Sequence, residues 1–238
     1  MFDTTITVVL LERLSRVYKR MFHAAMRAGR SPDEVRLVAV TKTVGTQTIR
    51  EAIEAGVRLL GESRVQEASK KIASEGLQLL GADLEWHLIG HLQRNKARSA
   101  VKLFTVIHTL DSIPLAEELE ARAAEAGKTQ RVLVQVNISE ETAKHGIARS
   151  KVEPLLEKTA ALPHLSLEGL MGMPPYFEEP EDARPYFARL RDIKEELAQR
   201  GFSLAELSMG MSHDFEVAIE EGATLVRIGT ALFGERSE

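Results

Sequence analysis

The sequence predicts a single (β/α)8 TIM barrel domain that spans residues 1–238. From residue 36 onward, short apolar segments rich in β-branched residues alternate with longer segments in which charges recur with a helical period. Strands that alternate with helices imply parallel pairing through right-handed crossovers. Eight such units in about 200 residues match the size of a barrel. A doubly wound open sheet is the main alternative, because periodicity alone does not separate the two.

Eight segments have the short, apolar, β-branched character of buried strands. They cover residues 36–41, 58–61, 84–90, 105–109, 131–138, 165–171, 204–209 and 225–229. Helices are expected between them over residues 46–55, 64–73, 113–126, 151–161, 183–200 and 213–221, with a shorter one over 93–100.

An extra helix, over roughly residues 8–28, is expected before the first strand. Its apolar residues recur at spacings of three and four, so this face must pack against the rest of the protein. They are Leu11, Leu14, Val17, Met21 and Phe22. Ser31, Pro32 and Asp33 then break the helix.

The composition excludes several classes of function. The 31 basic and 35 acidic residues are mixed along the chain and give a net charge of -4, so no basic stripe marks a nucleic-acid partner. The absence of cysteine excludes disulfides, a thiol nucleophile and thiolate metal sites. Apolar runs fall far short of the roughly 20 residues that span a bilayer, and the first residues lack the pattern of a secretory signal. We therefore expect a cytoplasmic protein without a nucleic-acid or membrane partner.

The last predicted strand places an arginine inside the barrel. Alternate residues of a barrel strand point inward, so Leu225, Arg227 and Gly229 are expected to share the inner face. A buried guanidinium needs hydrogen-bond acceptors. Arg227 therefore forms either a structural ion pair with a carboxylate such as Glu62 or Glu168, or a contact with a ligand above the barrel.

Loops rich in glycine and hydroxyl side chains follow the seventh and eighth strands, at residues 208–212 and from Gly229 and Thr230 onward. Glycine lets the backbone approach a ligand, and backbone N–H groups at a helix start bind phosphate. Loops at these positions of a barrel frequently form a phosphate site. Ser212 by itself is better explained as the N-cap of the following helix, but the two loops together indicate a phosphorylated ligand.

A lysine, Lys42, lies at the end of the first strand, where catalytic residues of barrels are usually found. Exposure to solvent is the commoner fate of a lysine. A partly desolvated amine near a cation such as Arg227 keeps more of the neutral form that Schiff-base formation requires. The lysine, the phosphate loops and the inward arginine together suit pyridoxal 5'-phosphate (PLP). A Schiff-base aldolase is an alternative, although the first strand is an uncommon place for its lysine.

No metal site is expected. His87 and His91 lie four residues apart, but at a strand end, where the helical zinc geometry does not hold. The chain also lacks the glycine-rich motifs of dinucleotide and nucleoside triphosphate sites.

Five blocks of the sequence resemble one family in the same order over residues 34–234. They are VAVTK at 38–42, WHLIG at 86–90, QRNK at 93–96, SMGMS at 208–212 and VRIGT at 226–230. The chain is identified by them as a member of the YggS/PROSC family of pyridoxal phosphate homeostasis proteins. This resemblance implies a barrel of the alanine racemase N-terminal domain type, without the second domain of the racemases.

The resemblance also implies that PLP is held as a Schiff base on Lys42. The phosphate would rest on Ser212, Gly229 and Thr230, and Arg227 would face the pyridine nitrogen. Because a guanidinium cannot accept a hydrogen bond, that nitrogen would stay unprotonated, and the ring would be a weaker electron sink. The full set of implied cofactor-binding residues is Lys42, Ser63, Ser208, Gly210, Ser212, Arg227, Gly229 and Thr230.

Family members are thought to bind and deliver the cofactor in vitamin B6 homeostasis, with PLP-dependent apo-enzymes as candidate recipients. We expect a monomer or weak dimer. A PLP-dependent amino-acid racemase is the alternative; it needs a second acid or base, and Tyr176 is the tyrosine expected near the barrel mouth. Two positions depart from the family: Ser63 replaces a common asparagine, which leaves its role open, and no proline follows Lys42.

Overall fold

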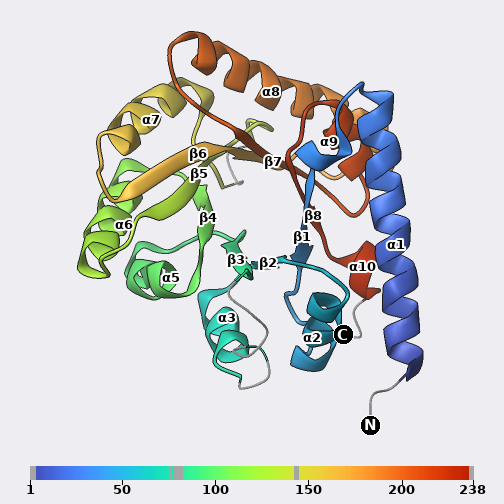
Figure 1. The fold of residues 1–238 in the computed structure, drawn as a ribbon. Helices are drawn as coiled ribbons and strands as arrows, with labels where there is room; N and C mark the ends of the chain where they lie inside the picture. Colours follow the sequence, from blue (N-terminus) through green and yellow to red (C-terminus); the bar gives the residue numbers. More distant parts are fainter. Residues whose placement is uncertain (1–3, 75–76, 78–82, 142–144, 236–238) are drawn as a thin grey trace.

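The computed structural model describes residues 4–74, 77, 83–141 and 145–235. Eight parallel strands close into a barrel in the order β1 to β8 (Figure 1), which confirms the predicted fold. Closure requires β1 to pair with both β2 and β8, and this excludes the doubly wound sheet. The strands are β1 (Arg36–Val40), β2 (Leu59–Glu62), β3 (Glu85–Leu88), β4 (Val106–Leu110), β5 (Gln130–Val136), β6 (Leu165–Gly172), β7 (Glu206–Met211) and β8 (Leu225–Ile228).

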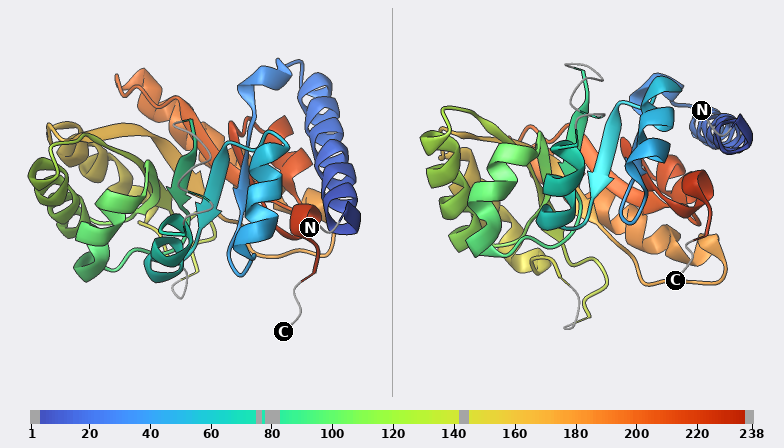
Figure 2. Two further views of the ribbon diagram at one scale, coloured as in Figure 1. Left: turned by 60° about the horizontal axis from the view of Figure 1, so that its bottom comes forward. Right: turned by 90° about the horizontal axis from the view of Figure 1, so that it is seen from below.

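Helices surround the barrel and connect its strands (Figures 1 and 2). In the described part of the chain they are α1 (Thr4–Arg27), α2 (Thr46–Glu54), α3 (Val65–Ile72), α5 (Ala97–Leu103), α6 (Ile113–Glu125), α7 (Val152–Ala160), α8 (Arg184–Gln199), α9 (Phe215–Glu220) and α10 (Thr230–Phe233). Each predicted strand and helix is confirmed to within a few residues. α5 begins later than predicted, at Ala97 rather than residue 93, because residues Arg94–Lys96 form a 3-10 turn before it, and α1 begins earlier, at Thr4 rather than residue 8. None of these helices is both long enough and apolar enough to cross a membrane.

The N-terminal helix α1 lies along the outside of the barrel, in contact with α2, α9 and α10 (Figure 2). Its buried face contains Leu14, Val17 and Met21, as predicted, together with Leu10 and Ala24. The prediction was wrong for two further residues, since Leu11 is 46% exposed and Phe22 is 49% exposed. At 100° per residue, Leu10 and Ala24 continue the spacing of the buried three, whereas Leu11 and Phe22 are rotated away from it.

The interior of the barrel combines one apolar cluster with polar side chains at its N-terminal end. The cluster consists of Val38, Leu59, Val106, Leu133, Met171 and Leu225. At the N-terminal ends of the strands, Arg131 pairs with Glu85 at 2.7 Å and with Glu168 at 2.6 Å. Arg36 pairs with Glu206 at the same end. The charges at this end of the barrel are thus matched by opposite charges.

Candidate functional site at the C-terminal end of the barrel

The predicted site residues lie at the C-terminal ends of β1, β2, β7 and β8. Lys42 follows β1, Ser63 follows β2, Ser208 and Gly210 lie in β7, Ser212 follows β7, Arg227 lies in β8, and Gly229 and Thr230 follow β8. Because β8 pairs with both β7 and β1, and β1 pairs with β2, closure of the barrel brings these segments onto one arc of its mouth.

Arg227 is buried on the inner face of β8, with 3% of its surface exposed. Its Nη1 donates to Oγ of Ser208 at 2.6 Å, and its Nη2 donates to the carbonyl oxygen of Gly172 at 3.2 Å. No ion pair joins Arg227 to any carboxylate in the described ranges. Of the two alternatives for Arg227, the structure excludes the ion pair with Glu62 or Glu168, because those carboxylates pair with Lys71 and Arg131.

Among the residues that the structure describes, none provides a contacting counter-ion for the Arg227 guanidinium. Burial lowers its pKa to about 10, and the carboxylate of Asp214 acts in the opposite direction. The side chain therefore stays cationic at neutral pH. A guanidinium has five N–H groups and no acceptor, so it can donate a further hydrogen bond to an acceptor atom of a ligand.

Ser212 joins the two loops that the sequence singled out. The prediction that it caps the following helix was wrong, because Asp214 is the N-cap residue of α9. Oγ of Ser212 instead accepts hydrogen bonds from the backbone amides of Gly229 and Ala231, each at 3.2 Å. Hydroxyl and amide groups therefore gather where β7 and β8 end.

Ser208 and Gly210 support the mouth from within the fold. Ser208 is fully buried beneath Arg227, so it acts through that side chain. Gly210 has a φ of +89°, and an added Cβ would lie 2.6 Å from Cβ of Ala218. Only glycine combines this backbone conformation with such a close approach of α9. Thr230 is exposed, and the backbone of Ser63 lies against Gly90.

A buried network centred on Lys71 was missed by the sequence analysis. Lys71 lies on α3 and is 8% exposed. Its Nζ donates to the carbonyl oxygen of Thr41 at 2.6 Å, to Oε1 of Glu62 at 2.7 Å and to Oε1 of Glu67 at 2.6 Å. The spacing of Glu67 and Lys71 on one helix was a visible signal, but the contact with Thr41 depends on how α3 packs against the barrel.

This network holds the backbone on both sides of the half-buried Lys42. Oγ1 of Thr41 donates to Glu62 at 2.6 Å, and the amide of Thr43 donates to Glu67 at 2.6 Å. Thr43 has a φ of +63°, a left-handed conformation that is rare for a β-branched residue. Such strain persists where the surroundings enforce it, and it clusters at functional sites.

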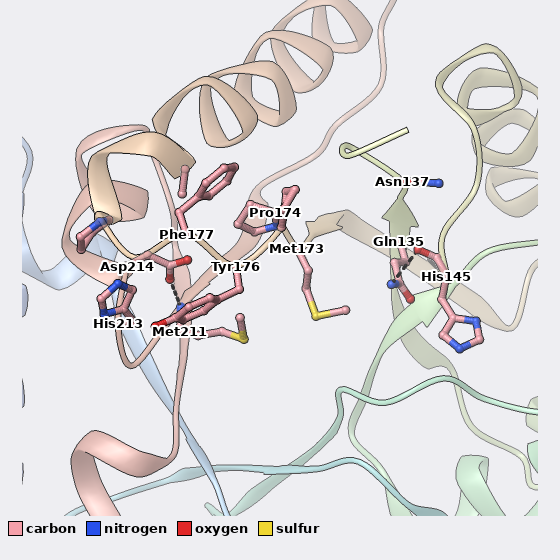
Figure 3. Close-up of a pocket in the computed structure, with 13 residues that line it drawn as sticks. Gln135, Asn137, His145, Met173, Pro174, Tyr176, Phe177, Met211, His213 and Asp214 are labelled. Carbon is pink, nitrogen blue, oxygen red and sulfur yellow. Dashed lines mark hydrogen bonds between the residues drawn. The ribbon is translucent and has the colours of Figure 1, made fainter. Parts of the chain in front are cut away.

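An apolar cavity of about 370 Å³ adjoins this arc (Figure 3). Met173 and Tyr176 line it from the segment after β6, and Met211 lines it from β7. Gln135 and His145 lie on its opposite side (Figure 3). Tyr176 does lie at the barrel mouth, as expected, and is 79% exposed.

Two histidines fill polar positions in the barrel interior. His87 on β3 is 1% exposed, and His108 on β4 is fully buried. Burial lowers the pKa of both, and for His108 the effect places the pKa well below its ordinary value. Both imidazoles are therefore neutral at neutral pH. No cluster of three or more His, Cys, Asp or Glu side chains with the geometry of a metal site occurs in the ranges described.

Comparison with known proteins gives one consistent group of relatives. Residues 18–237 match the family model of the alanine racemase N-terminal domain. A pyridoxal phosphate homeostasis protein of Aquifex aeolicus is 49% identical over 227 residues, which cover 94% of this chain and 97% of that protein. Its counterpart in Escherichia coli K12 is 41% identical over 232 residues, which cover 95% of this chain and 97% of the relative.

Solved structures agree with these relatives. The structure of PipY from Synechococcus elongatus with PLP bound has a TM-score of 0.81 and 39% identity, and the match covers 94% of this chain and 100% of that one. An alanine racemase of Clostridium difficile has a TM-score of 0.66 at 16% identity, a likeness of fold alone. That match covers 93% of this chain but 57% of the racemase.

Replacing Lys71 by methionine should lower the free energy of unfolding by about 3 kcal/mol, because the carboxylate of Glu62 is left buried and unpaired. Lys70→Met, at the adjacent exposed position, is the control and should change stability by less than about 0.5 kcal/mol. Adding Glu62→Gln to Lys71→Met should restore part of the loss. Urea denaturation measures all three, and similar stabilities for the Lys71 and Lys70 variants would contradict the network.

The buried histidines should make the protein less stable as the pH falls below about 6.5. The unfolded chain binds protons there that the folded imidazoles exclude, so each histidine costs up to about 1.4 kcal/mol per pH unit. His108→Asn removes one of these groups and should flatten the decrease between about pH 6.5 and 5. Thermal unfolding at a series of pH values measures the slope; the same slope in both proteins would show that His108 titrates normally in the fold.

Proposed function

Because the chain belongs to the family of pyridoxal phosphate homeostasis proteins, we propose that it binds PLP as a Schiff base on Lys42 and takes part in PLP homeostasis in the cytoplasm. The observation that carries this proposal is the buried Arg227, which no carboxylate in the described part of the chain contacts. A relative of 39% identity, PipY, has been solved with PLP bound. PLP-dependent apo-enzymes are the proposed recipients.

The residues present suit the chemical groups of PLP. A phosphate is a multiple acceptor, and the amides of Gly229 and Ala231 gather with the Ser212 hydroxyl at one place. A pyridine nitrogen is an acceptor, which matches the donor-only guanidinium of Arg227. Gly229 lies beside Val40, two residues before Lys42, so the end of β8 adjoins the lysine segment.

The protein's own groups would hold the ligand and limit its reactivity. PLP supplies an aldehyde that condenses with amines. Arg227 offers hydrogens and no lone pair, so a ring nitrogen that faces it stays unprotonated and draws less electron density from the rest of the ligand. The Lys71 network fixes the backbone around Lys42. This combination suits a carrier better than a catalyst of carbanion chemistry.

A racemase would need a second acid or base opposite Lys42. Tyr176 lines the cavity at the mouth, with its ring 5.6 Å from that of His213, but the residue is 79% exposed. This exposure supports the carrier.

Titration of the purified protein with PLP should produce a visible absorbance band, and borohydride should fix the ligand on the peptide that contains Lys42. Lys42→Ala should lose this adduct, because the nucleophilic amine is gone. Lys70→Ala, which removes an exposed lysine on α3, is the matched control and should label as the unmodified protein does. An equal yield of adduct in Lys42→Ala would refute the assignment. Exchange of the α-hydrogen of alanine with solvent at a turnover rate would favour the racemase instead.

A further inference from the structure

A continuous chain of hydrogen bonds crosses the barrel interior from Arg227 to Glu85. Arg227 on β8 bonds to Ser208 on β7 at 2.6 Å, and Oγ of Ser208 lies 2.9 Å from Nδ1 of His108 on β4. Nε2 of His108 lies 2.7 Å from Nδ1 of His87 on β3. Nε2 of His87 lies 3.3 Å from Oε2 of Glu85. Four strands thus contribute to one path, whose inner members are buried.

The direction of every hydrogen bond in this series follows from the carboxylate at its Glu85 end. That carboxylate only accepts, so a neutral His87 carries its hydrogen on Nε2 and donates it to Glu85. Nδ1 of His87 is then an acceptor, and a neutral His108 donates to it from Nε2. Nδ1 of His108 is in turn an acceptor, so Ser208 donates its hydrogen there and accepts from Arg227, which only donates. Both histidines are therefore Nε2–H tautomers.

Glu85, at the other end of this series of hydrogen bonds, remains an acceptor and so fixes the direction. Glu85 also accepts from Arg131 at 2.7 Å. Its hydrogen bond with His87, together with the charge of Arg131, lowers the pKa of Glu85 to about 2, so this carboxylate remains an acceptor. With both imidazoles neutral, reversing the links would turn the lone pair of His87 Nε2 toward the carboxylate of Glu85, so that two acceptors would face each other. Ser208 therefore always presents a lone pair to Arg227, and the guanidinium is held between Ser208 and the carbonyl of Gly172.

We propose that His108, acting through Ser208, is a positioning residue that orients Arg227 toward the ring nitrogen of bound PLP and so sets selectivity for a ligand with an acceptor nitrogen at that place. This inference rests on the proposed function. His108 is fully buried and acts at a distance from the ligand. Its effect should appear as a preference between ligands that differ at this one atom.

The test compares the binding of PLP with that of 1-deazapyridoxal phosphate, in which the ring nitrogen is replaced by CH. A hydrogen bond to a charged group contributes about 1.5–3 kcal/mol, so the unmodified protein should prefer PLP by roughly 10- to 100-fold. His108→Phe removes the acceptor for Ser208 and should bring this preference close to unity. His108→Asn retains an acceptor and should restore most of it.

A matched control separates positioning from general destabilisation. Val106 lies on β4, the strand of His108, and also points into the barrel, but it belongs to the apolar cluster. The Val106→Ala variant should therefore have a lower free energy of unfolding and an unchanged preference for PLP. A preference that His108→Phe leaves intact, or that Val106→Ala abolishes equally, would overturn the proposal.

Nitrogen NMR of the unliganded, unmodified protein tests the series of hydrogen bonds from Arg227 to Glu85 even if the His108→Phe variant does not fold. His87 and His108 should both appear as neutral Nε2–H tautomers at pH 7. A charged His108, or a hydrogen on its Nδ1, would overturn the proposal. The two hypotheses fail separately: an adduct on Lys42 with an unchanged preference in His108→Phe removes only the role of His108, whereas no adduct in the unmodified protein removes the proposed function as well.

Discussion

The site depends on one constraint: a positive charge is buried in the barrel, and none of the carboxylates that the structure describes contacts it. Taking a guanidinium out of water costs several kcal/mol unless acceptors replace the lost hydration. Arg227 donates hydrogen bonds to the hydroxyl oxygen of Ser208 and to the carbonyl oxygen of Gly172. Both of these acceptors are neutral, and so is the imidazole of His108 behind Ser208. The fold thus keeps a cation whose remaining donors suit an acceptor that a ligand provides.

The charged side chains at the two ends of the barrel differ in how they are paired. At the N-terminal end, Arg131 contacts both Glu85 and Glu168, and such matched charges stabilise the fold. At the C-terminal end, Arg227 contacts no counter-ion within the described ranges. Thr43 is held there in a strained left-handed conformation beside Lys42. This division agrees with the general pattern of barrels, in which the C-terminal ends of the strands carry function.

The fold was predictable because its signals are local. The strand and helix periods lie within short windows, and Lys42 and Arg227 stand out by their positions at strand ends. What was missed depends on tertiary contacts. Ser212 resembled a helix cap, but its partners lie 17 and 19 residues away, across the β7–β8 pair. Lys71 contacts Thr41 from 30 residues away, and the pairing of His108 with Ser208 joins residues 100 positions apart. No periodicity in the sequence encodes such contacts.

A crystal structure of the protein grown with PLP is the most direct test of the covalent site. We expect continuous electron density from Nζ of Lys42 to the ligand. The ring nitrogen should lie within hydrogen-bond distance of the Arg227 guanidinium, with the phosphate beside Ser212 and Gly229. Density that joins the ligand to a different lysine, or a ring whose nitrogen points away from Arg227, would contradict it.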